Sequence, residues 1–160
     1  MVRVYLGLGS NLGEGSGTIR SAFAALSAIL CEARLSRLWG SKPMYDEAQP
    51  DFVNAAASGT TALSPRKLLA AVHGIEASFG RVRIADRPKG PRTLDIDILL
   101  YGGLVLREDD LTIPHAALRE RLFALEPLLD LEPELLDPIS GLSYASIAAS
   151  LPPQGIYLLE

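Results

Sequence analysis

Two aspartates one residue apart, Asp95 and Asp97, have the clearest capacity for chemistry in this sequence. They lie in the stretch 94–101 (LDIDILLY), whose apolar run predicts a β-strand. Residues i and i+2 of a strand point to the same face, so both carboxylates would project together. Close carboxylates repel each other unless a cation lies between them, and Mg²⁺ commonly binds one or two carboxylates with water and substrate phosphates. Taken alone, the pair indicates either a magnesium site or a solvated strand face.

A basic segment directly before the aspartates favours the magnesium site. Residues 81–92 carry a local charge of +4, from five cations and one acid. The cations are Arg81, Arg83, Arg87, Lys89 and Arg92. Arginine forks match phosphate oxygens in a bidentate way and always carry charge. Arginines for phosphate oxygens beside carboxylates for Mg²⁺ are the parts that phosphoryl transfer requires.

Two further sets of residues bear on the ligand. Gly7, Gly9 and Gly13 have the spacing G-x-G-x-x-x-G, which matches neither the dinucleotide fingerprint nor a P-loop. We interpret these glycines as part of a strand-to-helix turn that needs positive φ angles. Phe52 and Asn54 would share one face of a strand over 52–61, and an aromatic face beside an amide suits a heteroaromatic ring, although a core role is the alternative.

Three other residues have open interpretations. Phe123 follows Arg121 in the C-terminal half and is either a second stacking face or a core residue. His115, after Pro114, is either a hydrogen-bond donor to phosphate or an ordinary loop histidine. His73 falls on a predicted helix, where we expect it at the surface.

The elements that would position these residues follow the order β-α-β-β-α-β. The expected strands cover 2–8, 32–39, 52–61 and 94–101. One expected helix begins at Thr18 as its cap, and the other begins at Ser64-Pro65 and ends at Gly80. Gly102-Gly103 predicts a hairpin from the last strand to 104–106, and prolines, Pro127 among them, would separate helical pieces after Pro114. The loops 40–51 and 80–93 are long enough to suggest function.

This order predicts an α+β protein. The expected fold is a ferredoxin-like α/β sandwich with an antiparallel sheet, an added hairpin and a C-terminal helical segment, in one domain over 1–160. The 160 residues suit one domain, and the net charge of −4 argues against extended nucleic-acid binding. Cys31 is alone, and neither a secretory leader nor an apolar run of about 20 residues is visible. We therefore expect a cytoplasmic protein without nucleic-acid or membrane partners.

Five separated motifs occur in order along the chain: 9–13 (GSNLG), 49–55 (QPDFVNA), 80–83 (GRVR), 90–98 (GPRTLDIDI) and 111–115 (LTIPH). Together they resemble the 6-hydroxymethyl-7,8-dihydropterin pyrophosphokinases of folate biosynthesis. The resemblance implies a ferredoxin-like fold and transfer of the β,γ-diphosphate of ATP to the hydroxymethyl group of the pterin, with release of AMP. We also expect a monomer.

The resemblance further implies a role for each matching residue. Asp95 and Asp97 would hold two Mg²⁺ ions, while Arg81 and Arg92 would contact phosphates from a mobile catalytic loop. The ATP-binding residues would be Arg83, Ile98, Thr112, His115 and Arg121, the last also reaching the pterin. The pterin would stack between two aromatic rings and meet an amide, the implied residues being Ser41, Pro43, Met44, Phe52, Asn54 and Phe123.

Four positions depart from residues found in some relatives. Lys89, Asp110, Ala116 and His73 stand where a tryptophan, an arginine, a tyrosine and a glutamine can occur, which affects the outer contacts to ATP and pterin. Two other functions use the same residues. A non-catalytic nucleotide-binding module would hold ATP without turnover, and a metal-dependent nuclease conflicts with the confined basic segment, because a polyanion needs an extended positive track.

Overall fold

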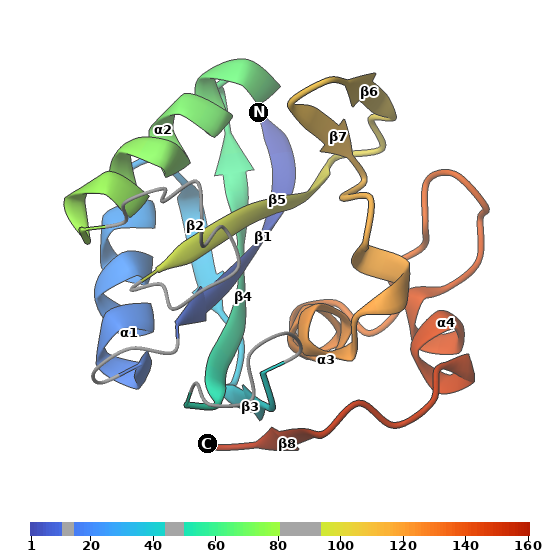
Figure 1. The fold of residues 1–160 in the computed structure, drawn as a ribbon. Coiled ribbons are helices and arrows are strands. Elements are labelled where there is room, and N and C mark those ends of the chain that lie inside the picture. The colour runs from blue at the N-terminus through green and yellow to red at the C-terminus, as the bar shows by residue number, and fades with distance from the viewer. Residues whose placement is uncertain (11–14, 44–49, 81–93) are drawn as a thin grey trace.

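An antiparallel sheet divides the molecule into two layers of helices (Figure 1). The computed structural model describes residues 1–10, 15–43, 50–80 and 94–160. The strands are β1 (Val2–Ser10), β2 (Cys31–Leu35), β3 (Trp39–Ser41), β4 (Phe52–Thr61), β5 (Asp95–Tyr101), β6 (Leu106–Glu108), β7 (Leu111–Ile113) and β8 (Ile156–Leu158). The helices are α1 (Gly15–Leu26), α2 (Pro65–Ser78), the 3₁₀ turn η1 (Leu118–Glu120), α3 (Leu122–Leu131) and α4 (Tyr144–Ser150).

The main sheet has the strand order β5-β1-β4-β3-β8, and β2 pairs with β4 beside β3. β1 is central and runs antiparallel to both β4 and β5. The chain thus follows the predicted β-α-β-β-α-β order, which confirms the ferredoxin-like fold with an antiparallel sheet. The strands of the site residues, β4, β1 and β5, are therefore neighbours in the sheet.

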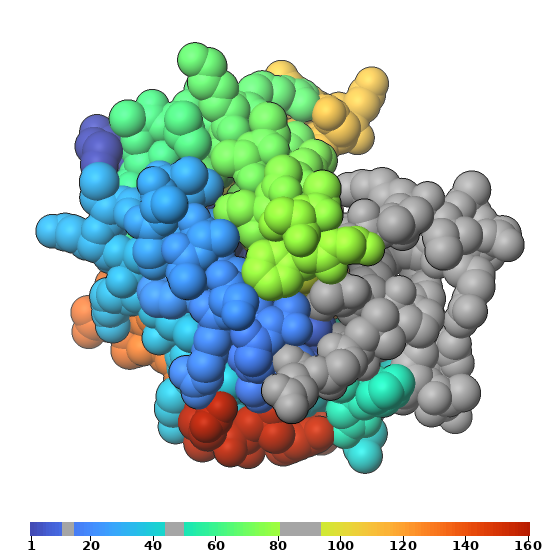
Figure 2. Space-filling view, turned by 90° about the vertical axis from the view of Figure 1, so that its left-hand side faces the viewer, coloured from blue at the N-terminus to red at the C-terminus, as the bar shows by residue number. Residues whose placement is uncertain are grey.

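Each face of the sheet has its own hydrophobic core, because alternate residues of a strand point to opposite sides. Leu6 and Ile96 belong to the core that includes the buried residues of α1 and α2. Tyr5 and Leu99 belong to the second core, with the buried residues of α3 and α4. Figure 2 shows α1 and α2 side by side on the first face, with the C-terminal residues beside α1. An ion pair of 2.8 Å between Arg20 and Glu160 joins those two parts of the chain.

The predicted start and end of α2 are confirmed. The hydroxyl oxygen of Ser64 accepts a hydrogen bond from the backbone N–H of Lys67, 3.3 Å away. Pro65 occupies the first turn, where its missing N–H has no intrahelical acceptor in any case. Gly80 adopts φ +78° just beyond the helix, a conformation that favours glycine.

The start of α1 was predicted wrongly. The helix begins at Gly15, so Thr18 lies inside it and is not the cap. A Cβ at position 15 would lie 2.6 Å from Cγ2 of Val53, and this close approach of the helix start to β4 requires glycine. The stretch predicted as one strand over 32–39 forms the end of one strand, β2, and the start of another, β3.

The hairpin was also misplaced. Gly102 turns the chain with φ +52° and donates its N–H to the carbonyl of Arg3 at 2.7 Å, and the strand that follows pairs elsewhere. The hairpin consists of β6 and β7, which form a separate two-stranded sheet. Pro127 lies inside α3 and does not interrupt it. The C-terminal strand β8, which the sequence did not indicate, pairs with β3.

Within the described residues, no helix has the length and apolar character that crossing a bilayer would need.

Candidate active site

Asp95 and Asp97 open β5 and project from the same face of the sheet. Both are half-buried, whereas Leu94, Ile96 and Ile98 between and beside them are buried. This alternation follows from strand geometry and leaves the Asp97 side chain 41% exposed. The two carboxylates therefore share one partly solvated surface, on the side of the sheet away from α1 and α2.

Next to Asp95 the sheet surface carries no β1 side chain, because β1 supplies Gly9 there, whereas the side chain of Leu99 packs over Gly7. Gly9 pairs in register with Asn54 of β4 on one side and with Asp95 of β5 on the other, and Gly7 pairs with Asp97. Among the described residues, a Cβ at Gly9 would meet little but Oδ1 of Asn54, at 3.6 Å, so these residues leave the space above this glycine open. Asn54 and Asp95, two strand spacings apart, are thus separated by a floor roughly 10 Å wide.

This position contradicts the turn interpretation of the N-terminal glycines. Gly7 and Gly9 lie within β1, bonded between two strands, and neither has a positive φ. The missing side chain of Gly9 shapes the site, and the missing side chain of Gly7 lets Leu99 pack against β1. Gly13 lies outside the described residues.

Asn54 stands on the far side of the glycine floor, in a fixed orientation. It is only 4% exposed, and its Nδ2 donates a hydrogen bond to Oγ of buried Ser41 at 2.8 Å. Phe52, two residues earlier in β4, lies on the same face of the sheet and pairs in register with Ser41. Pro43 follows shortly after β3 and is half-buried. The strand pair β3 and β4 thus brings together three of the residues predicted to contact a flat ring, Ser41, Phe52 and Asn54.

Phe123 and Arg121 come from the start of α3, which packs against β4 and β3. The guanidinium carbon of Arg121 lies 5.5 Å from the centroid of the Phe123 ring, within the range of a cation–π contact. Gln154 supports this segment, because its Oε1 accepts from the N–H of Leu122 at 2.9 Å and its Nε2 donates to the carbonyl of Glu120 at 2.8 Å. Sequence reasoning missed Gln154, since a lone glutamine distant in the chain gives no spacing signal.

His115 lies beside the acidic pair. Its backbone N–H donates to the carbonyl of Leu99 at 3.0 Å, which ties the segment after β7 to β5. Its Nε2 lies 3.8 Å from Oδ1 of Asp97. The backbone N–H of Ala117 donates to Nδ1 at 3.2 Å, so the proton of the neutral ring is on Nε2, the nitrogen that faces the aspartate.

Ile98 and Thr112, both predicted to bind ATP, differ in burial. Ile98 is 4% exposed and its side chain is in the core, so any contact to a ligand would involve its main chain. Thr112 is half-buried in β7, a strand that packs against β5.

The donor set suits a hard divalent cation. Within the described parts of the chain, no three His, Cys, Asp or Glu side chains gather closely enough to hold a metal by themselves. Two carboxylates on an open surface fit Mg²⁺, which keeps several waters and shares substrate phosphates.

Sequence comparison places this chain among known proteins. The profile of the family described as 7,8-dihydro-6-hydroxymethylpterin-pyrophosphokinase (HPPK) matches residues 5–133. The chain belongs to this family. It is 44% identical over 157 residues to the 2-amino-4-hydroxy-6-hydroxymethyldihydropteridine pyrophosphokinase of Pseudomonas aeruginosa, covering 96% of this chain and 94% of that protein. The identically named protein of Methylorubrum extorquens is 40% identical over the full length of both chains.

Other members of the HPPK family are parts of longer proteins. This chain is 43% identical to the folic acid synthesis protein fol1 of Pneumocystis carinii over 89% of its own length but only 19% of that protein. The crystal structure of wild-type HPPK-DHPS of Plasmodium falciparum with SDX-DHP superimposes with a TM-score of 0.69 at 16% identity, over 93% of this chain and 43% of that one. At this identity the likeness shows the fold alone.

Several predicted site residues of this HPPK-family chain lie outside the described residues, namely Met44, Arg81, Arg83 and Arg92, and so does the departing position Lys89. One of the departing positions, Asp110, has an ion-pair partner in the structure. Asp110 pairs with Arg66 of α2 at 2.6 Å, and this hydrogen bond lowers the pKa of the Asp110 carboxyl. His73 is exposed on α2, as predicted.

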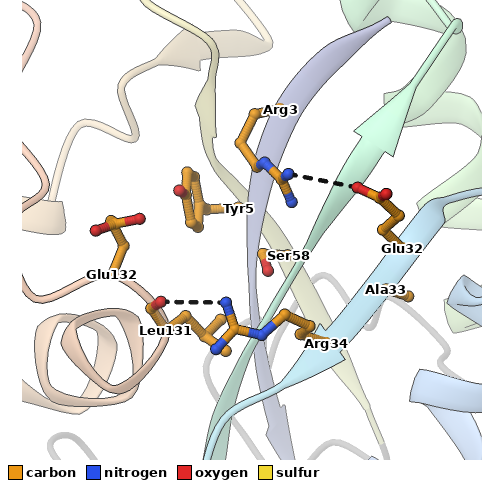
Figure 3. Close-up of a pocket in the computed structure, with 8 residues that line it drawn as sticks. All are labelled: Arg3, Tyr5, Glu32, Ala33, Arg34, Ser58, Leu131 and Glu132. Atoms are coloured by element: carbon orange, nitrogen blue, oxygen red, sulfur yellow. Dashed lines mark hydrogen bonds and ion pairs between the residues drawn. The ribbon is translucent and has the colours of Figure 1, made fainter.

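Figure 3 shows a cavity of about 440 Å³ beside the first residues of β1. The acidic pair lies beside the other end of this strand, where Asp95 and Asp97 pair with Gly9 and Gly7. The lining residues of the cavity are Arg3, Tyr5, Glu32, Ala33, Arg34, Ser58, Leu131 and Glu132. Within this cavity Arg3 lies 3.8 Å from Glu32, and Arg34 donates at 3.5 Å to the carbonyl of Leu131. The lining residues include none of the predicted site residues, so among the described residues this cavity is separate from the candidate active site.

Proposed function

We propose that this chain transfers the β,γ-diphosphate of ATP to the hydroxymethyl group of 6-hydroxymethyl-7,8-dihydropterin, giving AMP and the pterin diphosphate in folate biosynthesis. The observation that carries the proposal is the row Asn54–Gly9–Asp95 across three strands. It joins an oriented amide, a bare floor and a carboxylate on one face. A flat ring can therefore lie over the glycine with its reactive arm directed toward the acids, and membership of the HPPK family supports this reading.

Asp95 and Asp97 are the residues that would hold Mg²⁺, with two ions as the expected number. When bound, the metal supplies positive charge for the phosphate oxygens and lowers the pKa of the acceptor hydroxyl. Because Asp95 and Asp97 are only half-buried, their carboxylates keep part of their hydration, and the free energy cost of holding two negative charges at this place is reduced.

His115 and the backbone of β5 account for part of the ATP site. The Nε2–H of His115 faces the acidic pair and can donate to a phosphate oxygen. The N–H of Ile96 points away from β1, and backbone direction alternates along a strand, so the main chain of Ile98 also faces that edge. Its N–H and carbonyl suit the edge of an adenine. The remaining proposed ATP contacts come from Thr112, Arg81, Arg83 and Arg92. For the three arginines this proposal rests on the sequence motifs alone.

The pterin would occupy the other half of the row. Phe52 and Phe123 supply the stacking faces, and Asn54 supplies an acceptor and a donor for the ring edge. Ser41 holds Asn54 through its hydrogen bond. Pro43 and Met44 would contribute main-chain contacts, Met44 on the sequence resemblance alone. Arg121 lies beside Phe123, where a guanidinium can reach the transferred phosphates.

The reaction balances without a covalent enzyme intermediate. The hydroxymethyl oxygen forms a bond to the β-phosphorus, and the bond from that phosphorus to the oxygen bridging the α- and β-phosphates breaks. AMP leaves with the electron pair, and the hydroxyl proton goes to solvent. The protein accelerates this step by holding both substrates in line and by stabilising the charge on the phosphate oxygens.

Substrate dependence in two variants tests the proposal. Wild-type protein should consume ATP only with both Mg²⁺ and the pterin, and Asp97→Ala should lower that rate at least about a hundredfold, as expected when a charge-stabilising group is lost. Asp109→Ala, in the exposed turn between β6 and β7, is the matched control and should keep the wild-type rate. ATP binding without pterin-dependent turnover in the wild type would instead favour a nucleotide-binding module.

The proposal covers residues 1–160 as one domain that acts as a monomer in the cytoplasm, where ATP is available. Light scattering of the eluted protein tests the monomer, for which a mass near 17.1 kDa is expected. A mass near twice this value would contradict it.

A further inference from the structure

A buried carboxylate on α2 lies where a helix normally presents an apolar residue. Leu68, Val72 and Glu76 are spaced four residues apart and are the buried residues of this helix. Glu76 is only 3% exposed. A charged group in such a row is costly unless hydrogen bonds compensate it, so its presence needs an explanation beyond core packing.

Its partner lies between the two aspartates of the candidate metal site. The backbone N–H of Ile96 donates to Oε2 of Glu76 at 2.8 Å. Ile96 separates Asp95 from Asp97 in β5, and β5 is an edge of the main sheet. An edge strand leaves every second N–H without a strand partner, and here a side chain from the covering helix takes that place.

The hydrogen bond and the sheet together hold the acidic segment from two sides. Backbone direction alternates along a strand, so the main chains of Asp95 and Asp97 face Gly9 and Gly7 of β1, while Ile96 faces α2. The carboxylates project from the sheet between these two attachments. A shift of β5 relative to α2 would move both carboxylates together.

We propose that Glu76 is a positioning residue, which fixes where Asp95 and Asp97 present their carboxylates to the divalent cation. The inference rests on the proposed function, in which these two aspartates bind Mg²⁺. Groups that hydrogen-bond to the residues around a metal, without touching the metal, fix the orientation of its ligands. Their loss lowers metal affinity or activity by about 10- to 100-fold. Glu76 acts here through the backbone between two ligands and touches neither substrate.

Four variants separate positioning from general stability. Glu76→Leu removes the hydrogen-bond acceptor and puts an apolar side chain of similar size in its place. Glu76→Asp keeps the carboxyl group but shortens the side chain by one methylene. Glu76→Gln retains a carbonyl oxygen that can accept from Ile96. Leu68→Ala is the matched control, since it opens the same buried row two turns away from the contact.

Two measurements do not depend on turnover. Mn²⁺ binding with α,β-methylene-ATP, which cannot release AMP, is followed by electron paramagnetic resonance. Glu76→Leu and Glu76→Asp should weaken it about 10- to 100-fold, Glu76→Gln only a few-fold and Leu68→Ala not at all, although Leu68→Ala lowers the Tm. Hydrogen exchange of the Ile96 amide in metal-free protein should be faster in Glu76→Leu and Glu76→Asp than in wild type.

The outcomes distinguish this inference from the proposed function. Folded Glu76→Leu with wild-type Mn²⁺ binding, or with an Ile96 amide as protected as in wild type, would overturn the positioning role. Should Glu76→Leu fail to fold, Glu76→Asp decides by the same two criteria. Absence of Mn²⁺ binding in the wild type would contradict the metal site itself. In that case, slow exchange of the Ile96 amide in the wild type and fast exchange in Glu76→Leu and Glu76→Asp would still support the hydrogen bond that holds β5.

Discussion

The amide of Asn54 is locked by Ser41, through a 2.8 Å hydrogen bond from Nδ2 to Oγ. Both residues are buried, so the amide cannot exchange this partner for water without cost. Its Oδ1 is left directed over Gly9, 3.6 Å from the place of a Cβ. An acceptor is thereby aimed at the open floor before any substrate arrives.

Ser41→Ala should release this amide and weaken recognition of the pterin. Loss of one neutral hydrogen bond corresponds to about 0.5–1.5 kcal/mol, which predicts a roughly 2- to 10-fold higher KM for the pterin. The KM for ATP should remain unchanged, since Ser41 lies on the pterin side of the row. Steady-state kinetics with each substrate varied in turn measures both values, and an equal rise in the two would contradict the assignment.

Gly9→Ala should separate stability from activity. The added methyl has room in the free protein and replaces a flexible glycine in a strand, so the free energy of unfolding should stay the same or rise by up to about 1 kcal/mol. The same methyl would occupy the substrate floor and cost binding roughly 1–3 kcal/mol, as overpacking typically does. Gly103→Ala, where an added Cβ meets no described atom within 4 Å, is the control and should leave kinetics unaltered. Wild-type pterin affinity in Gly9→Ala would argue that the ring lies elsewhere.

Gln154→Ala tests whether the C-terminal segment sets the second stacking face. The amide of Gln154 joins Glu120 to Leu122 across the start of α3, so its loss should loosen Arg121 and Phe123. We expect weaker pterin binding, measured by calorimetry, with little change in Tm because these contacts are near the surface. Ser150→Ala, in the last turn of α4, is the comparison variant. A wild-type pterin affinity in Gln154→Ala would show that α3 holds its start without this support.

Asp137 gives the fold a pH dependence at the acid end. Burial by itself raises the pKa of Asp137, but hydrogen bonds from Ser140, Ile139 and Tyr144 outweigh it and lower the pKa below the ordinary value of 3.8. A carboxyl with a depressed pKa stabilises the native state fully above 3.8 and loses this contribution as the pH falls through its native pKa. Asp137→Asn should therefore reduce the free energy of unfolding near neutral pH by about 1–3 kcal/mol, and the difference should shrink below pH 3.8. Urea titrations across this range provide the check, and a difference that grows on acidification would have the wrong sign.

Local patterns predicted much of the fold. The alternation around Asp95 and Asp97 is read directly from 94–101, because side-chain direction in a strand depends only on position. Ser64-Pro65 and Gly80 marked the ends of α2 through capping that involves only near neighbours. The order of elements was enough for the ferredoxin-like class and the antiparallel sheet, although not for β8.

Features that depend on contacts between distant segments were missed. Gly7 and Gly9 suggested a turn, whereas pairing with β4 and β5 keeps them in a strand. Gln154 and β8 act on residues more than 30 positions away, for which one sequence carries no signal. Glu76 did have a signal, since it continues the four-residue spacing of Leu68 and Val72, but its acceptor role depends on an edge strand 20 residues later.

The nucleotide product tests the central claim most directly. Wild-type protein, Mg²⁺, ATP and 6-hydroxymethyl-7,8-dihydropterin are followed together by ³¹P nuclear magnetic resonance. Attack at the β-phosphorus predicts one AMP for each pterin, with two coupled phosphorus signals appearing on the pterin product. Formation of ADP and a pterin carrying one phosphorus would contradict the account.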